Sequence, residues 1–277
     1  MNIAHPPAGA FTEDNLCKQA KVVELVYSPH HDVMLPAIKL STGDVKAAHS
    51  EKYVLDVLAG RVRNGFMDAD PRKLQHAWES CAAQYSASLA ALLQQSVAFA
   101  PVSGFHHAGF SNSGGYCTFN GLIIAALKLR VADQLPRGLL IIDGDAHYGD
   151  GTQDIIDNLG LDWVKHVTLA NLNAGTADRA VQSALLDQNY SLVMYQAGAD
   201  CHIDDPFGAG YLTDSEWVAR DLELFELCKR MRTPVVFNLA GGYNGSKTLS
   251  LHCKTFLAAE QVFYPDSTRL IHRHRAS

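Results

Sequence analysis

The chain has 277 residues, of which 47% are hydrophobic and 19% charged, and its formal net charge at pH 7 is −6. A chain of this size buries a large core, and its negative balance provides no broad basic surface for nucleic acid or an anionic membrane. The longest apolar run, Gly121–Leu127, is far too short to span a bilayer. The six cysteines lack CxxC spacing, which is typical of reduced thiols in the cytoplasm, where we expect this protein.

The first third of the chain carries weak signals for secondary structure. Residues 1–20 are polar and contain two adjacent prolines, so we expect a flexible N-terminal arm. Val22–Tyr27 predicts a first strand, and Ser28–His49 predicts a long loop whose histidines, His49 among them, face solvent. Asp68–Gln95 has helical periodicity and predicts one long helix or two shorter ones.

From residue 97 onward, short apolar strands alternate with helices and short connections. This alternation predicts an α/β fold of three layers, in one sizeable domain or two small ones, with a mostly parallel sheet covered by helices on both faces. The strands are expected at Val97–Pro101, Leu139–Asp143, Val164–Leu169, Ser191–Ala197 and Pro234–Ala240. The helices are expected at Asn120–Val131, Asp150–Leu159, Thr176–Asp187, Ser215–Met231 and Gly245–Phe263.

Polar side chains follow four of these strands, near the point where each strand ends. The four sets are His106 with His107, Asp143 with Asp145 and His147, Asp205, and Tyr243. Because the carboxyl ends of parallel strands meet at one edge of a sheet, where open α/β folds bind their ligands, we expect one active site. Asp145, His147 and Asp205 offer two carboxylates and one imidazole, which suits a single hydrolytic metal with open positions for water and substrate.

The histidine pair and the tyrosine supply the remaining chemistry of a hydrolase. Histidine titrates near neutrality, so His106 and His107 on their glycine-flanked loop can transfer protons. The hydroxyl of Tyr243 can donate to a developing oxyanion. Cys117 with one of the histidines could form a thiol hydrolase, but we interpret Cys117 as a small buried residue beside the pocket.

Five motifs occur in one order along the chain. They are GFHHAG (104–109), GGYCTFN (114–120), DGDAHYGDGT (143–152), GADCHIDDP (198–206) and AGGYN (240–244). With them the chain resembles the zinc-dependent histone deacetylase family, which includes the acetylpolyamine amidohydrolases and has an arginase-like fold. The resemblance implies a single deacetylase-like domain over residues 1–277. It also implies a zinc-dependent amidohydrolase that uses metal-activated water to remove an acyl group, such as acetyl, from an amine.

The same resemblance implies roles for the residues around the metal. The Zn²⁺ ligands would be Asp145, His147 and Asp205. His107 would be the general base and acid, with His106 as its electrostatic partner. Asp143 and Asp150 would be the carboxylates behind His106 and His107 respectively, which fix the orientation of the two rings.

Further positions would contact the substrate or a second ion. Tyr243 would polarise the substrate carbonyl, and Gly115 and Tyr116 would line the acyl-amine tunnel, with the Gly115 carbonyl facing the substrate amide. Asp143, backbone carbonyls near it and Thr168 resemble the family's inner monovalent-cation site, which usually holds K⁺.

The chain departs from the family's pattern in three ways. Tyr148 stands where the family usually has a second histidine, which should affect the surroundings of the metal ligands more than the metal. The segment Ala170–Thr176 is shorter and lacks an aromatic tunnel residue, and the whole chain is short. We therefore expect trimmed loops around the tunnel. The expected substrate is a small acylated amine, such as an acylated polyamine, or an acyl-lysine peptide, with no nucleic-acid or membrane partner. The sequence carries no signal for an oligomeric state.

Two alternatives stay open. A binuclear manganese ureohydrolase shares the Asp-Ala-His pattern, but it needs carboxylates where this chain has Gly149 and His202, so a single metal is favoured. A catalytically weak protein that only binds acyl-amines is the second alternative. It is disfavoured because the matching ligands and Tyr243 are all present.

Overall fold

A seven-stranded parallel sheet forms the centre of the computed structural model, which describes residues 1–5, 14–208 and 210–266. The strand order is β2-β1-β3-β7-β6-β4-β5, and the pairings between these strands are parallel. The strands are β1 (Asn2–His5), β2 (Val33–Pro36), β3 (Val97–Ala100), β4 (Leu139–Asp143), β5 (Val164–Thr168), β6 (Leu192–Ala197) and β7 (Val235–Leu239).

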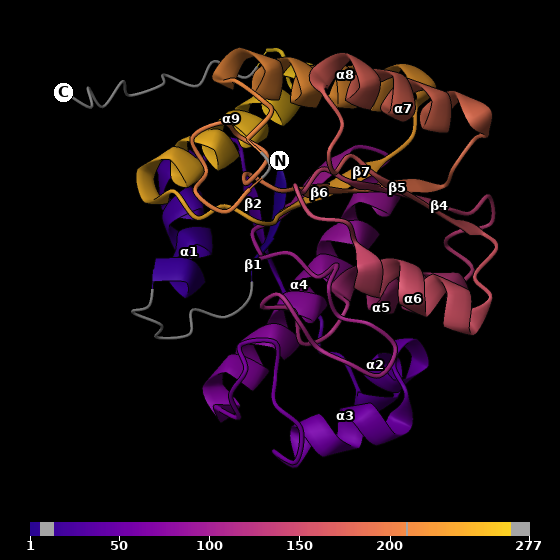
Figure 1. Cartoon of the computed structure of the whole chain (residues 1–277). Helices are drawn as coiled ribbons and strands as arrows, with labels where there is room; N and C mark the ends of the chain where they lie inside the picture. Colours follow the sequence, from indigo (N-terminus) through magenta and orange to yellow (C-terminus); the bar gives the residue numbers. More distant parts are fainter. Residues whose placement is uncertain (6–13, 209, 267–277) are drawn as a thin grey trace.

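Helices cover both faces of this sheet (Figure 1). They are α1 (Asp14–Val26), α2 (Thr42–Ala48), α3 (Glu51–Leu58), α4 (Pro71–Gln94), α5 (Gly121–Val131), α6 (Asp150–Leu159), α7 (Ala174–Asp187), α8 (Asp214–Met231) and α9 (Gly245–Phe263). One layer contains α4, α5 and α6, with α2 and α3 beside them, and the other contains α1, α7, α8 and α9. The predicted three-layer α/β fold is therefore confirmed. None of the described helices is both long and apolar enough to cross a membrane.

The central strands are buried on both faces, and alternate residues of one strand pack into different layers. In β4, Leu139 and Ile141 belong to the core beneath α4–α6, whereas Leu140 and Ile142 belong to the core beneath α7–α9. All four side chains are fully buried. A strand covered on both sides is an unbroken apolar run in the sequence, which is why the bounds of β4 are predicted correctly.

The start of the chain differs from the flexible arm predicted over residues 1–20. Asn2–His5 is strand β1, which pairs with β2 on one side and β3 on the other, and α1 begins at Asp14. Residues 6–13 of the predicted arm lie outside the described residues. The strand forms because partners far along the chain supply its ladder, and local composition does not reveal such partners.

The strand predicted at Val22–Tyr27 is also wrong, because these residues end helix α1. Val22 and Val26 are buried, whereas Leu25 and Tyr27 are exposed. A spacing of four residues places side chains on one side of a helix. Burial of that side against α9 outweighs the strand preference of valine.

The loop predicted over Ser28–His49 contains strand β2 and helix α2. Helix α3 follows this segment, and no sequence pattern predicts it. His49 is buried rather than facing solvent. Its Nδ1 donates to the carbonyl of Gly109 at 2.8 Å, and its Nε2 accepts from the amide of Asn120 at 2.9 Å. Helix α4 is one continuous helix that begins three residues after the predicted start, and the elements from residue 97 onward agree with the predicted ranges to within two residues at each end.

Candidate active site

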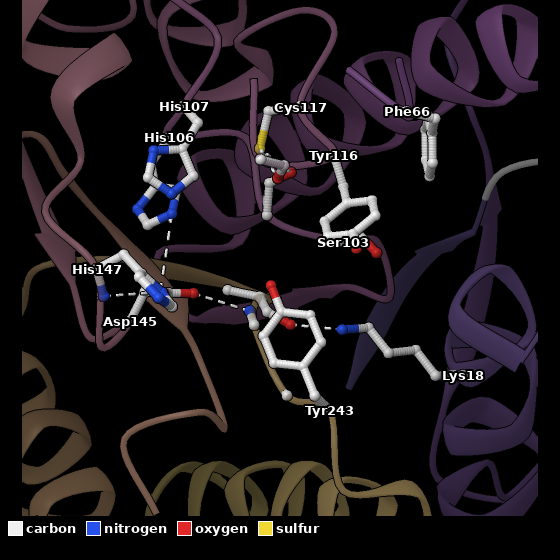
Figure 2. Close-up of a pocket in the computed structure, with 15 residues that line it drawn as sticks. Lys18, Phe66, Ser103, His106, His107, Tyr116, Cys117, Asp145, His147 and Tyr243 are labelled. Carbon is white, nitrogen blue, oxygen red and sulfur yellow. Dashed lines mark hydrogen bonds and ion pairs between the residues drawn. The ribbon is translucent and has the colours of Figure 1, made fainter. Parts of the chain in front are cut away.

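The four strands expected to carry the site are neighbours in the sheet, in the order β3, β7, β6 and β4. Since they are parallel, their carboxyl ends open on the same edge of the sheet. The turns after β3, β4 and β7 line a cavity of about 70 Å³ (Figure 2). The predicted site residues that line it are His106, His107, Gly115, Tyr116, Asp145, His147 and Tyr243. Three of the four sets expected at this edge therefore meet in one cavity, and Asp205, the set after β6, does not line it.

His106 is buried beside Asp143, the last residue of β4. Its Nδ1 lies 2.6 Å from Oδ2 of Asp143, so the ring donates a hydrogen bond to that carboxylate. Burial opposes a charge on His106, but Asp143 and Asp145 outweigh this effect and raise the pKa of the imidazole to about 9. Burial would raise the pKa of Asp143 in turn, yet His106 lowers it to about 2. The pair is thus an imidazolium next to a carboxylate.

His107 forms a second pair of this kind with Asp150, the first residue of α6. Its Nδ1 lies 2.6 Å from Oδ1 of Asp150, and its ring centroid lies 4.1 Å from that of His106. The side chain is 23% exposed, unlike that of His106. With Nδ1 engaged, Nε2 is the nitrogen left to exchange a proton in the cavity.

Asp145, His147 and Asp200 form a group that could hold a metal ion, with one ligand atom from each within 4.8 Å of the others. Nδ1 of His147 lies 3.1 Å from Asp145 and 3.0 Å from Asp200. These hydrogen bonds raise the pKa of His147 to about 10. Burial and the charge of Asp145 raise the pKa of Asp200 to about 6. Two buried carboxylates held against one imidazole suit a divalent cation.

Asp205, the third ligand expected from the sequence, lies outside that group. Its Oδ1 accepts from the amides of Phe207 and Gly208, each at 3.0 Å, and its Oδ2 accepts from the amide of Tyr243 at 2.7 Å. Asp205 is 9% exposed, whereas Asp200 is fully buried. Asp205 therefore ties the turn after β6 to the turn after β7, and its role as a metal ligand stays a prediction.

Tyr243 projects into the cavity from the turn after β7 (Figure 2). Burial raises the pKa of its phenol, which is therefore protonated at neutral pH. Its ring centroid lies 6.3 Å from that of Tyr116. Gly115 has a φ of +49°, and a Cβ at this position would lie 2.3 Å from Cδ2 of His107. Both the backbone conformation and the close approach of His107 therefore require glycine here.

Comparison with known proteins decides the family. The family described as "Histone deacetylase domain" matches residues 14–171, more than half of the chain. The chain belongs to the histone deacetylase family. Among its relatives, an uncharacterised protein of Picosynechococcus is 27% identical over 173 residues, or 54% of this chain and 57% of that protein. The acetylpolyamine amidohydrolase of Mycoplana ramosa is 44% identical over 55 residues, or 20% of this chain and 16% of that protein.

Solved structures of the histone deacetylase family share the fold over nearly the whole chain. The acetylpolyamine aminohydrolase from Burkholderia pseudomallei matches with a TM-score of 0.71 and 16% identity, covering 94% of this chain and 98% of that one. The HD domain of HDA15 matches with a TM-score of 0.73 and 18% identity, covering 93% of this chain and 86% of that one. These matches confirm the expected architecture. The aligned sequence segments span little more than half of the first curated relative and 18% of the second, histone deacetylase 6 of Caenorhabditis elegans.

Asp143 and Thr168, the two side chains predicted at the monovalent-cation site, come from neighbouring strands. Asp143 in β4 and Thr168 in β5 are register partners. The carbonyl of Asp143 accepts from the amide of Leu169 at 2.8 Å, and its Oδ1 accepts from Nε2 of Gln196 at 2.9 Å. The structure brings the two residues together, and the cation itself stays a prediction.

Cys117 lines the same cavity but has the properties of a structural residue. Its thiol donates to the carbonyls of Gly104 and Gly115 at 3.3 and 3.4 Å. Burial raises its pKa to about 12, which keeps it protonated at neutral pH. A thiol in that state is a poor nucleophile, so the interpretation as a small buried residue is favoured over a thiol hydrolase.

His202 occupies a second-metal position of the ureohydrolase pattern. Its ring does not belong to the group suited to a metal ion and bonds to other residues. Its Nε2 lies 2.8 Å from Asp214 at the start of α8, and its Nδ1 accepts from the amide of Asp204. Within residues 1–5, 14–208 and 210–266, the structure forms one group suited to a metal ion. A single-metal site is therefore favoured over a binuclear one.

Two buried residues of this site escape the sequence analysis. Gln196 in β6 is fully buried; besides its bond to Asp143, its Oε1 accepts from the amide of Phe105. Asp200 lies three residues after the end of β6. A polar residue inside an apolar strand, and an acid in the turn after one, are signals that could have found both.

Two further cavity residues carry no local signal, because tertiary packing brings them to the site. Lys18 reaches the cavity from α1, and Phe66 comes from the connection between α3 and α4. The ring of Phe66 lies 5.8 Å from that of Tyr116 and supplies aromatic surface at the cavity. No described residue of Ala170–Thr176 lines the cavity, and the reduced wall expected there stays a prediction.

Proposed function

We propose that this protein is a zinc-dependent amidohydrolase that removes an acyl group, acetyl in the simplest case, from an amine. One observation carries the proposal: two carboxylate-backed histidines, a group suited to a metal, and a tyrosine hydroxyl belong to one cavity. Membership of the histone deacetylase family supports the same reaction.

The donor set fits a zinc ion. Asp145 and His147 would hold it through one carboxylate and one imidazole, with Asp205 as the third ligand, and Asp200 would accept from His147 from behind. Asp205 is chosen because it is the aspartate of the GADCHIDDP motif that matches the family's ligand, and Asp200, which lies with Asp145 and His147, is the other candidate. When bound, such an ion lowers the pKa of water and polarises a carbonyl. Asp143 and Thr168 would belong to a K⁺ site beneath this group.

The side chains of the protein perform the proton transfers in this proposal. His107, oriented by Asp150, takes a proton from the attacking water at Nε2 and later gives it to the leaving amine. His106, charged beside Asp143, places a positive charge next to the reaction. Tyr243 donates its hydroxyl proton to the oxygen on which negative charge develops. The products are a carboxylate and a free amine.

The substrate is proposed to be a small acylated amine, such as an acylated polyamine, or an acyl-lysine peptide. The test is turnover of a panel of acylated lysines and polyamines by the purified protein, with metal analysis of the same sample. We expect zinc at one ion per chain and release of carboxylate, with activity lost on chelation and restored by zinc. Absence of turnover across the panel in the zinc-loaded protein would refute the proposal.

A further inference from the structure

An arginine is buried behind the candidate active site. Arg220 lies in α8 and is 3% exposed. Its Nε and Nη2 both donate to Oδ1 of Asp221, each at 3.1 Å. The guanidinium carbon lies 4.1 Å from the centre of the Trp217 ring. An ion pair and an aromatic ring therefore fix the plane of the guanidinium, and Nη1 is the nitrogen that extends toward the sheet.

Nη1 of Arg220 bonds to two turns at the carboxyl edge of the sheet. It donates to the carbonyl of Gly144 at 3.3 Å, in the turn after β4, and to Sγ of Cys201 at 3.2 Å, in the turn after β6. Gly144 precedes Asp145, and Cys201 follows Asp200. One nitrogen thus joins the two turns that carry the aspartates of the group suited to a metal ion.

The contact with Cys201 reaches Asp145 by a second route. The thiol of Cys201 accepts from Arg220 and donates to the carbonyl of Gly198 at 3.4 Å. Gly198 packs directly against Asp145, because a Cβ at position 198 would lie 2.6 Å from Cα and 2.7 Å from Oδ2 of that aspartate. Asp145 is therefore held through Gly144 in its own turn and through Gly198 in the next one.

The ion pair of Arg220 and Asp221 is itself held by neighbouring side chains. The hydroxyl of Tyr195 donates to Oδ1 of Asp221 and that of Thr255 to Oδ2, each at 2.5 Å. Both side chains are fully buried. A buried ion pair is often no more stabilising than well-packed apolar side chains of similar volume, so stability alone does not account for these charges. A rigid guanidinium that keeps two turns at one spacing does account for them.

We propose that Arg220 is a positioning residue for the proposed metal site, and that it fixes the spacing of Asp145 and Asp200 through Gly144 and Cys201. This inference rests on the proposed function and adds a residue that touches neither metal nor substrate. No residue of α8 lines the cavity, yet this helix sets the geometry of the carboxylates there.

The test measures zinc affinity by competition with a chelator, and the absorption spectrum of the cobalt-loaded protein, which reports the geometry of the ligands. Arg220→Lys keeps the charge but loses the planar fork that reaches Asp221 and both turns at once. We expect zinc affinity to fall by at least about tenfold and the cobalt bands to shift.

Thr255→Val is the matched control, because Thr255 supports the same ion pair from the side away from the two turns. It should lower the free energy of unfolding and keep the zinc affinity and the cobalt spectrum of the parent. A zinc affinity within about threefold of the parent in Arg220→Lys overturns the proposal. An equal fall in both variants also overturns it, since the effect would then be a general loss of stability.

Two variants at Cys201 test the same link with little change in volume. Cys201→Ala removes the thiol between Arg220 and Gly198, and it should weaken zinc binding by about threefold to tenfold, as loss of a neutral hydrogen bond predicts. Cys201→Ser, whose hydroxyl also accepts and donates, should restore most of the affinity. These variants decide the question if Arg220→Lys does not fold, and the parent's zinc affinity in Cys201→Ala then overturns the proposal.

Hydrogen exchange in the metal-free protein separates failure of this inference from failure of the proposed function. The amide of Ala146 donates to Oδ1 of Asp200 at 2.9 Å, between the same two turns. Relative to the amide of Ile141 inside β4, it should exchange at least about tenfold faster in Arg220→Lys, or in Cys201→Ala, than in the parent.

The two failures then give different results. If the parent binds zinc but hydrolyses no amide, the proposed reaction fails, and zinc affinity still decides the role of Arg220. If the parent binds no metal, the proposed function fails, and exchange of the Ala146 amide alone decides whether Arg220 holds the two turns together. Equal exchange in the variant and the parent would overturn that role.

Discussion

The amide of Gly241 donates to Oδ2 of Asp145 at 2.8 Å, across 96 residues of sequence. A Cβ at position 241 would lie 2.7 Å from the same oxygen and 2.1 Å from Oδ2 of Asp200. The turn after β7 therefore closes directly on the buried carboxylates at the proposed metal site. No side chain fits between them unless the carboxylates move.

This contact predicts the effect of Gly241→Ala. The new methyl group would push Asp145 and Asp200 apart, so we expect weaker zinc binding, a matching fall in activity, and a loss of about 1–3 kcal/mol in stability from overpacking. Gly245→Ala is the control, because a Cβ at Gly245 meets nothing within 4 Å. Zinc titration and urea unfolding of both variants provide the measurement. A Gly241→Ala protein with the zinc affinity of the parent would contradict this account.

Metal content distinguishes the two candidates for the third ligand. Asp205→Ala should lose zinc and activity together, whereas Asp200→Asn should weaken zinc binding by about 10–100-fold, as expected for a residue that orients a ligand. His202→Ala should keep its zinc, because His202 bonds to Asp214 instead. Elemental analysis of the three purified variants gives the answer. Zinc retained in Asp205→Ala and absent from Asp200→Asn would make Asp200 the ligand.

Tyr243→Phe separates catalysis from metal binding. The change removes one hydroxyl from the cavity and leaves the ring contact with Tyr116 in place. Loss of one oxyanion donor typically lowers kcat by about 10²–10³, and we expect a fall of this size with unchanged zinc content. Steady-state kinetics on an acylated lysine measures it. Activity within a few-fold of the parent would mean that another group serves the oxyanion.

His49 makes stability depend on pH. Burial lowers its pKa from 6.5 to about 4 in the folded protein. Between these values the unfolded chain binds a proton that the folded protein does not. The stabilisation that neutral, buried His49 gives to the folded protein is therefore complete above pH 6.5 and falls as pH drops toward 4. The loss in the free energy of unfolding amounts to about 3 kcal/mol.

Urea unfolding at several pH values tests this linkage. The fall in stability between neutral pH and pH 4.5 should be smaller in His49→Gln than in the parent, even if the variant is less stable at every pH. His30→Gln is the control, because the side chain of His30 is exposed. An identical pH slope in His49→Gln and the parent would show that His49 does not carry the effect.

The sequence predicts the second part of the fold well because two physical signals coincide there. Strands such as Leu139–Asp143 are buried on both faces and therefore form continuous apolar runs. Polar residues follow them because the carboxyl edge of a parallel sheet holds the site. This pattern predicts that His106, His107 and Tyr243 lie at one site, and the structure brings them to one cavity.

The first part of the fold and part of the site depend on contacts that no local pattern encodes. Asn2–His5 is a strand because distant partners flank it. Val22 and Val26 are helical because α9 covers them. Lys18 reaches the cavity for the same reason, since its position follows from how α1 docks rather than from its neighbours in sequence.

The strand order also has a consequence for the order of synthesis. Val235–Leu239 is the last of the described strands to leave the ribosome, yet it is the middle strand of the sheet, between β3 and β6. Until it inserts, β3 and β6 each present an unpaired apolar edge, which is a template for aggregation. A nascent chain that stops before residue 235 should therefore need a chaperone to stay monomeric, even though the segments that carry both histidine–aspartate pairs have already been made.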